Sequence, residues 1–258
     1  MRPQPALSVV IPAYNEASRL APTIREIVTY FRSCRRSIEL IVVDDGSCDG
    51  TSALVSTLAA EYDELRLIRL PQNRGKGYAV RSGVVNSSGQ YVLFADADGS
   101  TPIAEIERLE AAVRAGAELA IGSRALPSRE VQVKAKLYRR LIGRCFHGFV
   151  TLLTVRGIRD TQCGFKLFRT SVAHELFSRS RLDRFTFDVE VLFMAQRFGH
   201  RIAEIPVNWV HKPGSRVNLA LDSLRMARDL LRIRLYALRG AYDAAQLAPW
   251  YAAVGQSG

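Results

Sequence analysis

Short apolar runs alternate with amphipathic stretches along the first half of the chain, and this alternation limits the folds open to it. Each run has the composition of a buried strand, and the stretches between them have helical periodicity. The pattern predicts an α/β fold with a mostly parallel central sheet and helices on both faces. The expected strands are 7–12, 38–47 (ending in acids and a turn), 65–70, 90–98 and 117–124, and the expected helices include 17–31, 51–62 and 102–115.

Charged side chains follow three of the expected strands at the point where each strand ends. Asp44 and Asp45 close the second strand, Asp96 and Asp98 close the fourth, and Arg124 closes the fifth. Ligands of parallel α/β sheets bind outside the carboxyl ends of the strands. The four acids therefore predict a functional site at this edge, although capping of the following helix is an alternative for any one of them.

Asp96 and Asp98 are two residues apart, so an extended chain presents both carboxylates on one face. Carboxylates are hard oxygen ligands suited to Mg²⁺ or Mn²⁺, and phosphate oxygens commonly complete the coordination of such an ion. The pair predicts a site for a divalent metal and a diphosphate. Ser100 could add a hydroxyl or a water-mediated contact.

The composition bounds the class of protein. The chain has 258 residues, 48% of them hydrophobic, and a formal net charge of +11, which favours an anionic partner such as a phosphate-bearing ligand, a membrane surface or nucleic acid. Its four cysteines lack metal-ligand spacing and read as free thiols of a reducing compartment. The best late apolar stretch, 146–155, is shorter than the roughly 20 residues that span a bilayer. We expect a cytoplasmic protein, peripheral at the inner face of the membrane.

Two basic amphipathic stretches occur in the second half, at 134–155 and 219–238. In the second stretch, leucines recur at helical spacing with arginines beside or opposite them. A helix of this kind can lie in a bilayer interface with its arginines on anionic headgroups. An ordinary packed helix or a dimer face is the alternative.

Several motifs resemble those of a known family. VVIPAYNE (9–16), IVVDDGSCDGT (41–51), NRGKGYAVRSG (73–83) and DADGS (96–100) occur in the order seen in family 2 glycosyltransferases of the GT-A fold. DTQCGFKLF (160–168) and FDVEVLF (187–193) are similar to the branch of dolichyl-phosphate β-glucosyltransferases and other polyprenyl-phosphate hexosyltransferases. The resemblance implies inverting transfer of a hexose, glucose from UDP-glucose, to a polyprenyl or dolichyl phosphate.

The resemblance also implies roles for individual residues. Asp96 and Asp98 match the metal-binding acids, and His211 and Arg216 resemble a late loop that closes over the donor diphosphate. The metal would be Mg²⁺ or Mn²⁺. The other positions that match nucleotide-sugar contacts are Pro12, Tyr14, Glu16, Asp44, Asp45, Gly75, Lys76 and Gly77.

A phosphate acceptor is already anionic at neutral pH and needs cations more than it needs a base. We predict that Arg124 and Lys166 dock the acceptor phosphate. Residues two apart on a helix do not share a face, so at most one of Asp188 and Glu190 points into the site. That residue would be the general base if the acceptor were a hydroxyl. The predicted catalytic residues are Asp98, Asp188, Arg124 and Lys166, and the predicted acceptor residues are Arg124, Arg140, Gln162, Cys163, Gly164 and Lys166.

We expect a catalytic domain at 1–216, with a nucleotide-binding half at 1–124 and an acceptor half at 125–216, followed by an amphipathic helix and tail at 217–258. Two other functions stay open. One is glycosyl transfer to a soluble hydroxyl acceptor, and the other is a non-catalytic basic module that binds membrane or nucleic acid. The acid pairs would repel the phosphates of a nucleic acid unless a metal is present, so we expect no nucleic-acid partner.

Overall fold

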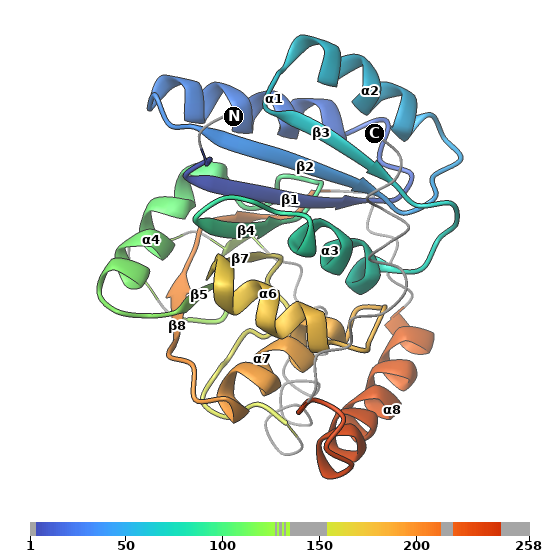
Figure 1. Ribbon diagram of the computed structural model, residues 1–258, viewed down its shortest axis with the longest axis vertical. Helices are drawn as coiled ribbons and strands as arrows, with labels where there is room; N and C mark the ends of the chain where they lie inside the picture. Colours follow the sequence, from blue (N-terminus) through green and yellow to red (C-terminus); the bar gives the residue numbers. More distant parts are fainter. Residues whose placement is uncertain are drawn as a thin grey trace.

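The computed structural model describes residues 4–126, 128, 131, 133–134, 154–212 and 219–243. A seven-stranded sheet forms the centre, in the order β3-β2-β1-β4-β7-β5-β8 (Figure 1). Every neighbouring pair is parallel except those of β7, which runs antiparallel to both β4 and β5. The expected mostly parallel sheet is confirmed. Its strands are β1 (Leu7–Ala13), β2 (Ile38–Asp44), β3 (Leu65–Arg69), β4 (Tyr91–Ala95), β5 (Leu119–Ser123), β7 (Phe165–Arg169) and β8 (Ile202–Pro206).

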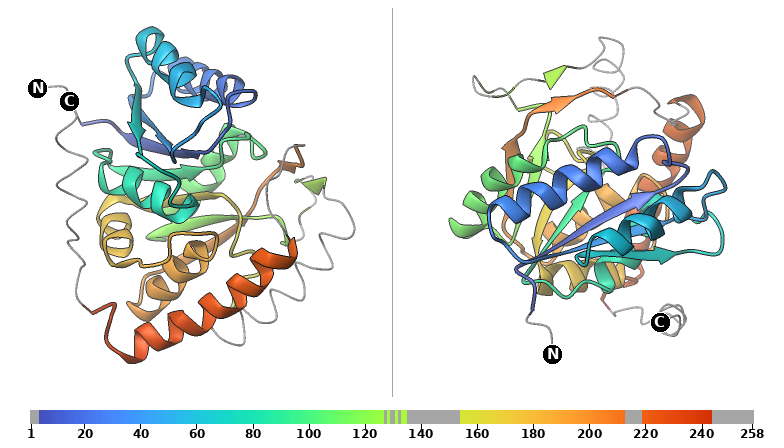
Figure 2. Two further views of the ribbon diagram at one scale, coloured as in Figure 1. Left: turned by 90° about the vertical axis from the view of Figure 1, so that its right-hand side faces the viewer. Right: turned by 90° about the horizontal axis from the view of Figure 1, so that it is seen from above.

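Helices cover both faces of the sheet (Figure 2). Successive residues of a strand point to opposite faces, so Val9 of β1 packs in one apolar cluster with α1, α2 and α4, and Val10 packs in the other with α3, α6, α7 and α8. The helices are α1 (Leu20–Ser33), α2 (Thr51–Glu61), α3 (Lys76–Val85), α4 (Ile106–Arg114), α6 (Thr170–Arg179), α7 (Phe187–Arg197) and α8 (Leu219–Leu238).

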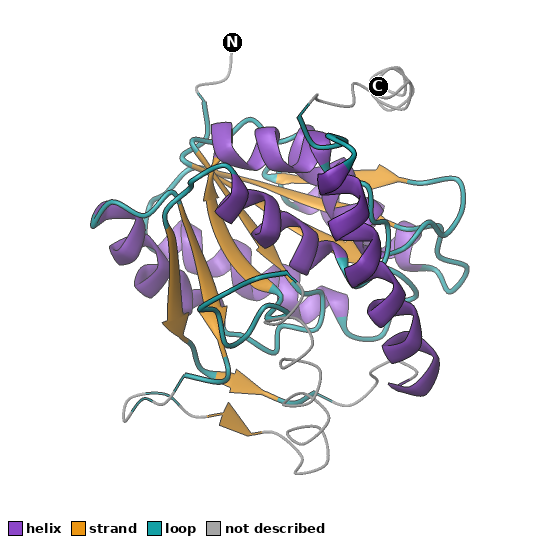
Figure 3. Cartoon of the chain, turned by 90° about the horizontal axis from the view of Figure 1, so that it is seen from below, coloured by secondary structure: helices purple, strands orange, loops and turns teal. Residues whose placement is uncertain are grey.

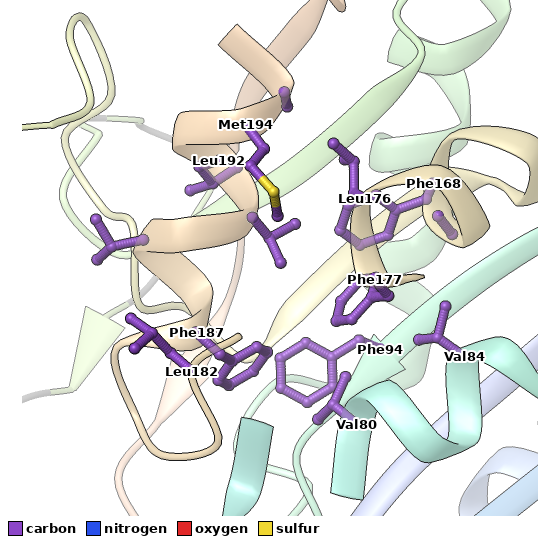
Figure 4. Close-up of a cluster of buried hydrophobic side chains, with 14 of the residues drawn as sticks. Val80, Val84, Phe94, Phe168, Leu176, Phe177, Leu182, Phe187, Leu192 and Met194 are labelled. Carbon is purple, nitrogen blue, oxygen red and sulfur yellow. The ribbon is translucent and has the colours of Figure 1, made fainter. Parts of the chain in front are cut away.

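Aromatic packing fixes the start of α7 against the end of β4. The rings of Phe94 and Phe187 meet edge to face with centroids 5.8 Å apart, and Phe177 of α6 adjoins Phe187 (Figure 4). Gly77 of α3 permits this approach, because an added Cβ would lie 2.7 Å from the Cβ of Phe187. The first turn of α7, with Asp188, is thereby brought to the carboxyl end of the sheet.

The observed boundaries differ from the expected ones in a few places. The helix expected at 17–31 spans Leu20–Ser33, and the helix expected from 102 starts with a 3₁₀ turn at Ile103–Glu105 before α4. A separate ribbon pairs β6 (Val133–Lys134) with β9 (Trp209–Val210), apart from the central sheet (Figure 3).

Some predictions fall on parts of the chain that are not described. Arg140, Arg216 and most of the basic stretch 134–155 lie outside the described residues. None of the helices within the described ranges combines the length and the apolar character needed to cross a bilayer.

Candidate active site

The antiparallel pairing of β4 with β7 brings the DADGS and QCGFK motifs together. Phe94 lies opposite Lys166, and just beyond the strand the amide of Asp96 donates to the carbonyl of Gly164 at 3.0 Å. A Cβ added at Gly164 would lie 2.1 Å from a carboxylate oxygen of Asp96. A larger residue at Gly164 would therefore displace the Asp96 carboxylate from this position.

The donor atoms at the end of β4 fit a divalent cation. Asp98 Oδ1 accepts a hydrogen bond from the amide of Ser100 at 2.9 Å, and the Ser100 hydroxyl is buried without a hydrogen-bond partner among the described residues. No group of three or more His, Cys, Asp and Glu side chains suited to a metal occurs in the described ranges. Two carboxylates and an unused hydroxyl match Mg²⁺ or Mn²⁺ that takes its other ligands from substrate phosphates.

Lysine side chains surround this acid pair. The Lys76 ammonium lies 2.7 Å from Asp96 Oδ1, and Lys212 Nζ lies 3.0 Å from the point where a Cβ would sit on Gly99. Burial would lower the pKa of Lys76, but the carboxylates of Asp96 and Asp188 outweigh it and hold that pKa above its ordinary value. Lys76 therefore stays charged and partly neutralises the acids.

Asp188 and Lys166 form a buried ion pair. Their charged atoms are 2.5 Å apart, the residues are 4% and 2% exposed, and Lys166 also donates to the carbonyl of Cys163 at 2.6 Å. Burial raises the pKa of Asp188, and the charges of Lys166 and Lys76 oppose the rise. The Lys166 ammonium is thus directed at Asp188 and is closed off from solvent.

Arg124 is held by Asp160, a residue for which no role was predicted. Its guanidinium donates to both carboxylate oxygens of Asp160, at 2.7 and 2.9 Å, and its amide donates to the same side chain at 2.9 Å. Burial alone would raise the pKa of Asp160, but Arg124 more than offsets it and lowers that pKa. The guanidinium also lies 5.6 Å from the ring centre of Trp209, which stacks on His211. Arg124 is therefore fixed in direction while its side chain stays about a third exposed.

Asp45 shapes the glycine loop, by which we mean residues 73–77 with Gly75 and Gly77. Its carboxylate accepts from the amides of Arg74 and Gly75, each at 2.8 Å, and from the side-chain amide of Asn73 at 2.9 Å. Burial raises the pKa of Asp45, and these backbone hydrogen bonds oppose the rise. Gly75 has φ +113°, a conformation that glycine adopts at little cost.

The remaining predicted nucleotide residues lie around the ends of β1 and β2. Pro12 and Asp44 are buried within these strands, Tyr14 is exposed, and Glu16 forms an ion pair with Arg19. The structure thus brings the predicted residues of both strand ends to one edge of the sheet.

Two residues that were predicted to contact the acceptor, Gln162 and Cys163, lie in different environments. Gln162 Nε2 lies 4.0 Å from the sulfur of Met226 on α8, and it is half-buried. The Cys163 side chain is in the apolar core against Gly122, and burial raises the pKa of its thiol to about 12. No role was predicted for Asp160, although it stands first in the DTQCGFKLF motif, or for Trp209, for which the sequence carries no comparable signal.

The chain matches known proteins over most of its length. Residues 8–177 match the family model described as glycosyl transferase family 2. A human dolichyl-phosphate beta-glucosyltransferase is 42% identical over 93% of this chain and 78% of its own length. The protein of the same name from Saccharomyces cerevisiae is 38% identical over 92% of this chain and 76% of its own length.

Solved structures share the fold. Glucosyl-3-phosphoglycerate synthase from Mycobacterium tuberculosis, in complex with UDP, superposes with a TM-score of 0.65 at 19% identity, covering 94% of this chain and 82% of that one. The same enzyme with Mn²⁺, UDP-glucose and phosphoglyceric acid gives a TM-score of 0.64, also at 19% identity, over 94% of this chain and 81% of that one. At this identity the likeness concerns the GT-A fold alone. With the family match and the relatives above, it follows that the chain is a glycosyltransferase and belongs to glycosyl transferase family 2.

Proposed function

We propose that this enzyme transfers glucose from UDP-glucose to dolichyl phosphate or a similar polyprenyl phosphate, with inversion at the anomeric carbon. Relatives named dolichyl-phosphate beta-glucosyltransferase, aligned over more than nine-tenths of this chain, support the reaction. The observation that carries the proposal is Arg124, a fixed and partly exposed guanidinium that follows β5 at the same edge of the sheet as Asp96 and Asp98. Burial would lower the pKa of Arg124, but Asp160 above all, followed by Cys163 and Asp96, outweighs burial and raises it.

The donor would bind at the ends of β1, β2 and β4. Asp96 and Asp98, with the unused hydroxyl of Ser100, would hold Mg²⁺ or Mn²⁺, which when bound supplies positive charge to the leaving diphosphate. Lys76 stands at the first turn of α3, beside these acids, where its charge favours the same group. The glycine on either side of Lys76 allows a close approach of the backbone to the phosphates.

The acceptor phosphate would bind at Arg124. A planar guanidinium binds phosphate through two parallel N–H donors, and the hold of Asp160 orients it before the acceptor arrives. Because the acceptor is an anion at neutral pH, the attack needs alignment with the anomeric carbon and no proton transfer. In this account Lys166 acts on the phosphate only indirectly, by neutralising Asp188, which would otherwise repel it.

The lipid would be reached through α8. Leu231, Leu235 and Leu238 are 60%, 41% and 86% exposed, while Leu230 and Ile233 pack in the core, so the leucines form an apolar stripe on the outer side of the helix. We call these three residues the leucine stripe. The exposed arginines at 228 and 239 lie beside it, and this composition suits the interface of an anionic bilayer. We propose peripheral binding at the cytoplasmic face of a membrane through this stripe.

A donor comparison tests the reaction. With dolichyl phosphate in vesicles and Mn²⁺ present, sugar transfer from UDP-glucose should exceed transfer from UDP-galactose and from GDP-mannose. Removing the dolichyl phosphate should abolish transfer and leave only slow donor hydrolysis. Equal transfer from GDP-mannose, or transfer that does not need the lipid phosphate, would refute the proposed substrate pair.

A further inference from the structure

The segment between α6 and α7, residues 180–186, packs directly against the glycine loop. A Cβ added at Gly75 would lie 2.5 Å from the carbonyl oxygen of Asp183, and one added at Gly77 would lie 2.6 Å from that of Leu182. Real Cβ atoms do not approach a backbone oxygen so closely. The position of the glycine loop therefore depends on the position of this segment.

Hydrogen bonds join the same two pieces of chain. The amide of Tyr78, one residue past the glycine loop, donates to the carbonyl of Asp183 at 3.1 Å. Arg81 of α3 donates to the carbonyl of Ser180 at 3.0 Å and pairs with the carboxylate of Asp183. Because of these contacts, a displacement of the segment 180–186 would also displace the glycine loop.

Glu190 of α7 holds the segment from its other side. The amide of Arg181 donates to both of its carboxylate oxygens, at 3.1 and 3.0 Å, and the amide of Leu182 donates at 2.9 Å. The Glu190 side chain is fully buried, and no salt bridge to it occurs among the described residues. Its hydrogen bonds, with the nearby charge of Arg81, are therefore what opposes the cost of its burial.

A third donor group reaches Glu190 from the turn after α8. Tyr242 is fully buried, and its hydroxyl donates to Glu190 Oε1 at 2.8 Å. Arg181 of the segment 180–186 also contacts this turn. Its guanidinium donates to the carbonyl of Ala241 at 2.8 Å and lies over the ring of Tyr236. The turn after α8 and the segment 180–186 are thus tied together through one carboxylate and one guanidinium.

We propose that Glu190 and Tyr242 are positioning residues for the nucleotide-sugar donor. Together they hold the segment 180–186 as the support of the glycine loop, so that the turn after α8 sets the geometry of the donor site without touching the donor. The inference rests on the proposed function, because it takes the glycine loop to contact the diphosphate.

Amide hydrogen exchange on the ligand-free protein tests the support. In Tyr242→Phe, which removes only the hydroxyl, amides within 74–79 and 181–182 should exchange roughly 3- to 10-fold faster, because a buried carboxylate loses one of its hydrogen bonds. Tyr236→Phe is the matched control, since it removes the same group from a ring 6.2 Å from that of Tyr242, and it should leave these amides unchanged. Unchanged exchange at 74–79 in Tyr242→Phe would overturn the inference.

Nucleotide binding then tests the consequence for the donor. The Kd of UDP with Mn²⁺ and the KM for UDP-glucose should rise roughly 3- to 10-fold in Tyr242→Phe, with kcat little changed. Glu190→Gln keeps an acceptor oxygen and should retain more UDP affinity than Glu190→Ala. Faster exchange with unchanged UDP affinity would overturn the inference and leave the proposed function intact. The exchange measurement uses no nucleotide, so its result does not depend on the sugar that the enzyme transfers.

Discussion

The Lys76 ammonium lies 2.7 Å from Asp96 Oδ1, on one of the two carboxylates that we propose bind the metal. Asp96 and Asp98 are like charges two residues apart, and Lys76 relieves their repulsion in the ligand-free protein. The positive charge of Lys76 also repels a divalent ion bound to the same carboxylates. The arrangement suggests that the metal binds well only when a nucleotide diphosphate supplies negative charge to both cations.

Replacement of Lys76 should therefore affect the metal and the nucleotide in opposite directions. Lys76→Met should tighten Mn²⁺ binding without nucleotide by roughly fivefold or more, because two unit charges about 4 Å apart repel by about 1–4 kcal/mol and the metal ion carries two charges. The same change should weaken UDP binding in the presence of Mn²⁺. Titration of free Mn²⁺ by electron paramagnetic resonance measures the first effect, and calorimetry measures the second. Arg74→Met, in the same loop, is the control, and weaker Mn²⁺ binding in Lys76→Met would contradict the interpretation.

The buried pair of Asp188 and Lys166 should be costly to break singly. Removal of one partner from a buried ion pair commonly costs about 3–5 kcal/mol, since the other charge is left uncompensated. Asp188→Asn and Lys166→Met should each lower the free energy of unfolding by an amount in this range, and the double variant should lose clearly less than their sum. Chemical denaturation of the four proteins measures this coupling. Strict additivity would show that the two side chains do not stabilise one another.

The Asp188→Asn variant also tests whether Asp188 acts as a general base. A missing general base commonly slows a reaction by roughly 10²–10⁴-fold. A phosphate acceptor needs no deprotonation, so folded Asp188→Asn should lose less than that range in turnover with dolichyl phosphate. A loss within the range, at a temperature where the variant is folded, would mean that Asp188 removes a proton from the acceptor.

Glu190 predicts a pH dependence of stability. Burial raises its pKa to about 7, against the hydrogen bonds from Leu182, Arg181 and Tyr242 and the charge of Arg81, whereas the unfolded chain has the ordinary value near 4.5. Between these values the folded state retains a proton that the unfolded state has lost, so stability falls as the pH rises through this window and is level on either side. Relative to Glu190→Gln, the wild type should lose roughly 3 kcal/mol from pH 4.5 to pH 7. Denaturation across this range is the measurement, and a constant difference between the two proteins would contradict the assignment.

Membrane binding through α8 should depend on both the apolar and the basic side chains. Changing the leucine stripe to serine should abolish flotation with phosphatidylglycerol vesicles, and Arg228→Gln with Arg239→Gln should weaken it. Each basic residue near such a surface contributes about 1 kcal/mol, and salt reduces this contribution because the Debye length is about 8 Å at physiological ionic strength. Arg25→Gln with Arg169→Gln is the matched control, since both arginines are exposed on other elements. Flotation of the leucine-stripe variant at the wild-type level would refute this surface.

The strands and the site edge could be predicted because they depend on local patterns. Apolar runs of strand length, each ending in a charged or turn residue, are enough to place Asp44 and Asp96 at one edge of a parallel sheet. The antiparallel direction of β7 could not be read in this way, because it depends on a pairing with β4 across about 70 residues of chain. The division of domains at residue 216 falls outside the described ranges and stays a prediction.

The hydrogen-bond and ion-pair partners of the site residues could not be predicted either, because they also depend on contacts between distant parts of the chain. Arg124 meets Asp160, 36 positions further along the chain, and Lys166 meets Asp188, 22 positions further, and no local periodicity specifies such pairs. The prediction that Lys166 contacts the acceptor phosphate treated it as a free cation. Its burial against Asp188 could be known only from the packing of α7 on β4 and β7.

The most direct test of the central claim is the identity of the product. The purified protein, Mn²⁺, vesicles with dolichyl phosphate and UDP-glucose labelled in the sugar should yield label that extracts into organic solvent and is released by mild acid as glucose. The intact lipid product should carry glucose in the β configuration, since UDP-glucose is the α anomer and the proposed transfer inverts. Arg124→Gln should reduce this product strongly while UDP binding stays near the wild-type value. Label that appears only on a water-soluble acceptor, or a lipid product of α configuration, would contradict the account.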